Sequence, residues 1–143
     1  MRSAVGGESN LEQGVWRRYR LARLLRRLPV VTIYKICERE QWRAAEAAGQ
    51  FRGSPVDERD GFIHFSTAAQ LAETASKHFA KVTDLILVAV DDVALGAQLR
   101  WERSRGGDLF PHLYATLPLG AVRWARPLPD EIDGRRPLPE LEP

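Results

Sequence analysis

Hydrophobic positions along this chain follow two different periods, which predict where its strands and helices lie. Runs of β-branched residues, or alternating apolar and polar residues, predict strands at 30–37, 61–66, 84–90, 98–102, 109–115 and 121–124. Helical spacing and good helix formers predict helices at 38–48 and 68–80. The segment 84–90 is the most apolar, so we expect it to be the central buried strand. Early helices followed mainly by strands favour an α+β fold with two main helices.

Local signals mark the ends of both helices and the segment between them. Gly49 is the type of residue that commonly ends a helix, and it follows the first one. Thr67 precedes the second helix, and Gln70 stands three residues later, which predicts a capping box. The intervening segment 51–60 is mostly polar and contains Pro55, so we expect a loop there.

Charge and proline content divide the chain into three regions. Residues 1–28 contain seven arginines and two glutamates, a net charge of +5, and predict a basic extension that is partly disordered or a peripheral helix. Residues 29–126 are expected to hold the folded domain, and 127–143, with five of the nine prolines, an irregular tail. Beyond residue 28 there are 14 basic and 17 acidic residues, a net charge of −3. Any nucleic acid is therefore expected to bind only through the extension.

The composition narrows the class of protein. A chain of 143 residues, 44% hydrophobic and 28% charged, is expected to fold as one globular domain. Its longest apolar run, at 85–90, is far shorter than the roughly 20 residues of a membrane helix, so no membrane partner is expected. The one cysteine, Cys37, rules out an internal disulfide and a multi-cysteine zinc site. A reducing, cytoplasmic location is the simplest expectation, and the oligomeric state is left open.

The first candidate site lies at 61–67. Strand alternation places His64 and Ser66 on one face with Phe62, while Ile63 and Phe65 face the core. The next helix begins directly afterwards at Thr67, and the unpaired N–H groups of a helix start favour an anion. This arrangement predicts a phosphate or phosphate-ester site. The alternative is a histidine bonded at the sheet surface, with Thr67 serving only as a helix cap.

The second candidate site lies at 101–114, where ionisable and aromatic residues concentrate. Alternation places His112 and Tyr114 on one face of the final strand of this segment, and Glu102 lies on the strand before it. Gly106 permits a close backbone approach to a ligand, and Arg105 could bind a phosphate with two hydrogen bonds. The alternative is an ordinary hairpin turn with a solvated ion pair. The third histidine, His78, is expected to be a packing or surface residue.

Three stretches of the chain resemble a known family over about residues 30–126. They are DGFIHFSTAAQLAETASKHF, DLILVAVD and LGAQLRWERSRGGDLFPHLYATLPLGAV. They are similar to a bacterial and plant family catalogued as domain-of-unknown-function family 952, which has no established activity. The resemblance implies membership of the ADP-ribosyltransferase superfamily, which has a split β-sheet and whose active members bind NAD in a central cleft.

The superfamily's motifs can be placed on single residues of this chain. Its Tyr-His-Gly motif corresponds to Tyr34-Lys35, with lysine in place of histidine. His64 stands at the tyrosine position of Gly-Ile-Tyr-Phe, where the tRNA 2′-phosphotransferase branch also carries a histidine. His112 stands where many transferases have the glutamate that polarises the ribose, and Glu102 is a candidate substitute from another strand. The resemblance therefore implies a cleft formed by Lys35, His64 and His112.

Three functional hypotheses follow from these residues. The first is a transferase that takes NAD or a related nucleotide, with His64 on the ribose, His112 as general acid–base, and Arg105 with the helix start at Thr67 on the pyrophosphate. The second is a non-catalytic nucleotide-binding module. The third is a two-histidine cyclic phosphodiesterase, since His64-Phe65-Ser66 matches one His-x-Ser unit, although His112-Leu113-Tyr114 does not supply the second.

Overall fold

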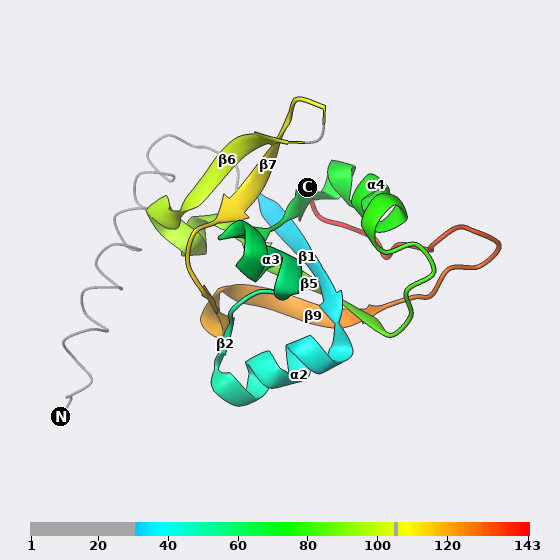
Figure 1. The fold of residues 1–143 in the computed structure, drawn as a ribbon, viewed down its shortest axis with the longest axis horizontal. Helices are drawn as coiled ribbons and strands as arrows, with labels where there is room; N and C mark the ends of the chain where they lie inside the picture. The colour runs from blue at the N-terminus through cyan, green and yellow to red at the C-terminus, as the bar shows by residue number, and fades with distance from the viewer. Residues whose placement is uncertain (1–30, 105) are drawn as a thin grey trace.

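A four-stranded antiparallel sheet forms the centre of the computed structural model, which describes residues 31–104 and 106–143 (Figure 1). Its strands lie in the order β4 (Ser66–Thr67), β1 (Thr32–Glu38), β5 (Leu85–Asp91) and β9 (Val122–Leu128). Six of the seven β5 residues are buried, as the apolar pattern predicts. The sequence thus places the most apolar strand between two neighbours, where both of its faces are covered.

Two smaller antiparallel sheets lie beside the central one. One has the order β3 (Ile63–His64), β7 (Asp108–Leu113) and β6 (Leu99–Ser104), and the other pairs β2 (Gln50–Phe51) with β8 (Leu117–Pro118). Short 3₁₀ helices, Asp92–Gln98 and Leu119–Ala121, precede β6 and β9. The mixed α+β class is therefore confirmed among the described residues.

The predicted strand 61–66 is wrong as a single element, because the chain changes sheets within it. β3 pairs with β7, whereas β4 pairs with β1, and Phe65 stands between them. The Phe65 amide donates to the Pro111 carbonyl at 3.0 Å, which holds this junction against β7. His64 consequently lies where the two sheets separate.

Both predicted helices are present, and a third was missed. Helix α2 (Arg39–Ala48) ends at Gly49 in the left-handed conformation, and α4 (Ala68–His78) starts with the predicted Thr67–Gln70 capping box. The predicted loop 51–60 instead contains helix α3 (Pro55–Asp60). Six residues are too few to display a hydrophobic period, but Ser54 caps α3 and proline occupies its first turn.

The hydrophobic core occupies both faces of the central sheet. Along β1, Ile33 and Cys37 enter one cluster, which the smaller sheets and α2 complete. Tyr34 and Ile36 face the opposite side and pack with residues of α4, such as Leu71. The alternation of β1 therefore ties both halves of the core to one strand.

Residues 129–143 pack back onto this second face. Leu138 and Leu141 contact its core cluster, and the Tyr34 hydroxyl donates to the Glu142 carbonyl at 2.8 Å. Arg136 donates to the carbonyls of Phe79 and Val82 just after α4. The predicted tail thus contributes to the core, and the expected domain end at 126 falls within β9.

The predicted extension 1–28 lies outside the described residues. Within the described part of the chain, no helix is long and apolar enough to cross a membrane.

Candidate functional site

A cleft of about 530 Å³ borders one edge of β1. It arises because β4 pairs only with Ile33 and Tyr34, so the rest of that edge continues beyond the end of β4. Helix α3 and β3 supply titratable groups to the lining, including Asp60 and His64, while α4 supplies Leu71, Thr74 and His78. The split between the sheets therefore creates a concave site lined by titratable groups.

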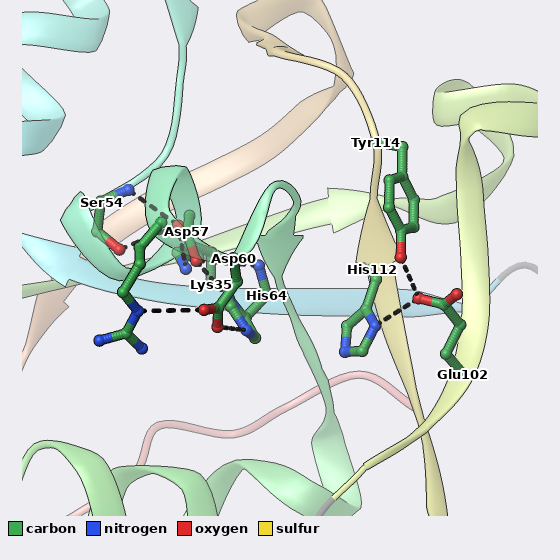
Figure 2. Close-up of polar contacts among 9 residues, drawn as sticks. Lys35, Ser54, Asp57, Asp60, His64, Glu102, His112 and Tyr114 are labelled. Atoms are coloured by element: carbon green, nitrogen blue, oxygen red, sulfur yellow. Dashed lines mark hydrogen bonds and ion pairs between the residues drawn. The ribbon is translucent and has the colours of Figure 1, made fainter.

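Asp57 is the centre of the polar contacts behind this cleft (Figure 2). Its carboxylate is 1% exposed and accepts from Lys35 Nζ at 2.6 Å. The Ser54 amide and hydroxyl donate to the same oxygen at 2.9 and 3.0 Å. The other oxygen contacts His64 Nδ1 at 2.6 Å and accepts from the His64 amide at 3.2 Å. One buried side chain therefore joins α3, β1 and β3.

The surroundings of Asp57 keep this carboxyl ionised. Burial alone would raise its pKa, but the hydrogen bond with His64, the charge and hydrogen bond of Lys35, and the Ser54 amide together hold the pKa well below its usual range. A buried charge is tolerable when it is paired and hydrogen-bonded in this way. Asp57 is thus a fixed negative group beneath His64.

His64 presents its second ring nitrogen to the cleft. With Nδ1 held by Asp57, Nε2 lies 3.1 Å from an oxygen of Asp60, whose other oxygen accepts from Arg59 Nε at 3.2 Å. The His64 side chain is 22% exposed, so it is reachable from solvent. An imidazole held by a buried carboxylate on one side and by a more exposed carboxylate at the cleft on the other is oriented for a role as a general acid–base or as a ligand-binding histidine.

A second histidine cluster lies beside the first, on the β6–β7 hairpin. His112 Nδ1 lies 2.8 Å from Glu102 Oε1, and the Tyr114 hydroxyl donates to the same oxygen at 2.7 Å (Figure 2). The hydrogen bonds from Tyr114 and His112 lower the pKa of Glu102, and the hydrogen bond to Glu102, with a smaller effect of its charge, raises the pKa of Tyr114. The Arg100 guanidinium lies over the Tyr114 ring. Glu102, from another strand, thus fixes the orientation of His112.

Phe62 connects the two clusters. Its ring stacks on His112 at 4.1 Å between centroids and contacts the rings of His64 and Tyr114 at 4.5 and 5.2 Å. His64 and His112 are register partners on β3 and β7, with ring centroids 5.5 Å apart. The two histidines predicted to lie together therefore do so, because alternation places them on the same face of the small sheet.

The other predicted residues are only partly brought together. Lys35 and Ser66 line the cleft with His64, although the Ser66 hydroxyl is buried and bonded to that of Thr74. His112 and Tyr114 are not on the lining of this cleft; they lie beside it, where Phe62 packs against both rings.

The remaining predicted positions have other places. Thr67 accepts from the Gln70 amide as a cap, which confirms that part of the prediction. Gly106 lies in the hairpin turn with φ of +88°, and Arg105 lies outside the described residues. His78, expected to be a packing or surface residue, is exposed and lines the cleft.

Sequence reasoning missed Asp57 and Asp60. Both fell inside a segment predicted to be a loop, and only the Ser54-Pro55 pair with Asp57 at the third helical position signals the helix that carries them.

Burial raises the pKa of Cys37 to about 12 despite the Lys35 charge, so this thiol is uncharged at neutral pH. Across residues 31–104 and 106–143, no three His, Cys, Asp or Glu side chains are grouped to hold a metal ion.

Comparison with known proteins places this chain in a family. The family described as "Protein of unknown function (DUF952)" matches residues 36–125, so the chain belongs to it. The crystal structure of protein CC0527 from Caulobacter crescentus is similar, with 47% identity, a TM-score of 0.71, and coverage of 74% of this chain and 93% of that one. Its solution NMR structure is similar at a TM-score of 0.66 and 47% identity, covering 74% and 90%. A comparison with curated proteins gave no match.

Proposed function

We propose that this protein is a nucleotide-binding enzyme of the ADP-ribosyltransferase type, which takes NAD or a related nucleotide into the cleft beside β1. The observation that carries the proposal is the fixed orientation of His64, whose Nδ1 is held by the buried Asp57 while its Nε2 faces the cleft. The cleft volume of about 530 Å³ is in the range of small-molecule sites.

Positive groups on the cleft lining support a phosphate-bearing ligand. Arg59 is 73% exposed and Lys35 is paired with Asp57, and both lie on a lining that also carries the carboxylates of Glu38 and Asp60. Leu71 of α4 and Phe79 just after it offer an apolar surface for an aromatic base. His64 would contact the ribose or a phosphate directly. In ADP-ribosyl transfer the bond from C1′ to the nicotinamide nitrogen breaks, nicotinamide leaves, and the acceptor bonds to C1′ and loses a proton. The Asp60 carboxylate, which lines the cleft 3.1 Å from His64 Nε2, can receive that proton.

The second candidate is a nucleotide-binding module without catalysis. It is favoured by the place of His112, whose side chain is 6% exposed and which lies outside the cleft lining. The cyclic phosphodiesterase hypothesis has less support, because the Ser66 hydroxyl is engaged by Thr74 and His112 lies beside the cleft.

A ligand screen followed by a turnover assay separates these candidates. We expect NAD or ADP-ribose to raise the melting temperature of the wild type, since a ligand that binds only the folded state stabilises it. His64→Ala should weaken binding about tenfold or more, as for a lost hydrogen bond to a charged group. His78→Ala serves as a comparison, because it also removes an imidazole from the cleft lining but leaves the contact between His64 and Asp57 in place, so we expect a smaller loss than in His64→Ala.

Catalysis is read from the release of nicotinamide. The proposed enzyme releases it in the wild type and not in His64→Ala. Binding without release would favour the module. If no nucleotide raises the melting temperature, the proposed function is wrong.

A further inference from the structure

The imidazole of His64 lies between two carboxylates that differ in burial. Asp57 is 1% exposed and is held by Lys35 and Ser54 as well as by His64. Asp60 is 34% exposed, and its contacts are with His64 Nε2 at 3.1 Å and with Arg59 Nε at 3.2 Å. Water can hydrate the Asp60 carboxylate when it leaves His64. The Asp57 carboxylate, in contrast, would remain a buried charge without its His64 partner. Of the two carboxylates, only Asp60 is therefore easy to displace.

Asp60 occupies the donors that an incoming oxyanion needs. His64, Arg59 and Asp60 all line the cleft, and the arginine side chain is 73% exposed. Figure 2 shows the Asp60 carboxylate joined to the His64 ring by a dashed line, and Asp57 contacts the other ring nitrogen. An imidazole nitrogen and a guanidinium at hydrogen-bond distance from one carboxylate form a two-point site for an anionic group.

We infer that Asp60 is an internal competitor of the ligand: its carboxylate stands where a phosphate group binds, and the phosphate displaces it from His64 Nε2 and Arg59. This inference rests on the proposed nucleotide site and adds a regulatory element to it. The ligand class is an oxyanion with at least two charged oxygens, which replaces one carboxylate and neutralises the same donors. The apparent affinity is then the intrinsic affinity multiplied by the fraction of molecules in which Asp60 has left the site.

The inference predicts whether removing the Asp60 carboxylate strengthens or weakens ligand binding. If Asp60 competes with the ligand, its removal strengthens binding. If Asp60 instead contacts the ligand, for example by accepting from a ribose hydroxyl, its removal weakens binding. Removing any negative charge near the site also favours an anion, so a control must remove a similar charge without vacating His64. Glu58 provides it, because it is an exposed carboxylate on the same short helix.

The test is a titration with inorganic pyrophosphate, followed by the nitrogen NMR signals of the imidazoles. We expect Asp60→Asn and Asp60→Ala to bind pyrophosphate about threefold to tenfold more tightly than the wild type. This range corresponds to the free energy of one partly exposed ion pair, which pyrophosphate no longer has to displace. Glu58→Gln should change affinity less than about twofold. Arg59→Gln should weaken binding. Pyrophosphate should move the His64 Nε2 signal, identified by its loss in His64→Ala.

The outcomes separate this inference from the proposed function. Suppose that pyrophosphate binds the wild type and not His64→Ala, but binds both Asp60 variants no more tightly than the wild type. The binding site at His64 would then stand, and the role of Asp60 as a competitor would be overturned. An equal gain in Glu58→Gln and Asp60→Asn would also overturn it, because the effect would then be one of general charge. If pyrophosphate and nucleotides bind neither the wild type nor the Asp60 variants, the proposed function and this inference are both wrong. Melting temperatures confirm that each variant is folded.

Discussion

Each of the two histidine clusters pairs an imidazole with a carboxylate, but the carboxylate is the buried partner in one cluster and the imidazole is in the other. In each, an imidazole Nδ1 faces a carboxylate. In the first, the carboxylate of Asp57 is 1% exposed and the His64 side chain 22%. In the second, Glu102 is 36% exposed and the His112 side chain 6%. The exposed member decides which chemistry meets a ligand, so the first cluster offers an imidazole and the second a carboxylate with a phenol.

The origin of each carboxylate explains this difference. Asp57 lies on a helix packed behind its histidine and is fixed by Lys35 from β1. Glu102 lies on β6, an edge strand of the three-stranded sheet, where water reaches it. A buried partner fixes a histidine and makes the local fold depend on it, whereas an edge-strand partner orients its histidine with less effect on the fold.

The strongest way to break this comparison is to remove each carboxylate in turn. Asp57→Ala leaves the Lys35 charge buried without this partner, so we expect the free energy of unfolding to fall by about 3–5 kcal/mol. Glu102→Ala should cost clearly less, because its site is open to water. Denaturant titration of both variants measures the difference. Equal losses would contradict the assignment of a structural role to Asp57.

The pH dependence of stability should follow Asp57. Its pKa is lowered in the folded protein, so its stabilising contribution is complete above the unfolded value of about 4 and is lost as the pH falls below it. We expect the wild type to lose stability below about pH 4, and Asp57→Asn to show a flatter profile there. Glu102→Gln serves as the comparison. A profile in Asp57→Asn as steep as that of the wild type would assign the acid sensitivity to other carboxylates.

A double-mutant cycle tests whether the clusters act as one unit. The rings of His64 and His112 are in contact and both touch Phe62. We expect His64→Ala and His112→Ala to be non-additive in unfolding free energy by about 0.5–1 kcal/mol. Thermal or denaturant unfolding of the two single variants and the double variant gives this value. Additive effects would make the clusters independent despite their contact.

The smallest expected effect is spectroscopic. Glu102 raises the pKa of Tyr114, mainly through their hydrogen bond, so Glu102→Gln should lower the pH at which this phenol ionises. Ultraviolet absorbance during an alkaline titration measures it, and Tyr114→Phe identifies the signal. Tyr34, whose pKa is raised by burial in another part of the molecule, should be unaffected. No change in the Tyr114 titration would contradict the contact.

Sequence reasoning was most successful where the deciding interactions are local. Alternation in a strand and the capping box at Thr67 depend on residues a few positions apart, and both gave the correct face or function. Alternation gave each histidine its face, whereas the expectation that His64 and His112 lie together came from the family resemblance, and they are register partners on β3 and β7. The nucleotide and its chemistry stay predictions, because no such periodic signal identifies a ligand.

The missed parts depend on context that no short window contains. Asp57 is an ordinary acidic residue in a polar segment until Lys35, far away in sequence, packs against it. The switch of sheets at Phe65 leaves alternation unchanged, so the pattern shows one strand where the fold has two. Glu102 was recognised as lying on a different strand, but only the β6–β7 register brings it to His112.

The contact between Tyr34 and Glu142 also has a consequence for the order of synthesis. It joins residues 108 positions apart, and Tyr34 lines the cleft. At about 5–20 residues per second, Tyr34 is translated about 5–20 s before Glu142. During that interval β1, α4 and β5 can pair and pack, but the face that carries Tyr34 lacks Leu138 and Leu141. A nascent chain stalled before these residues would therefore present an apolar surface to chaperones.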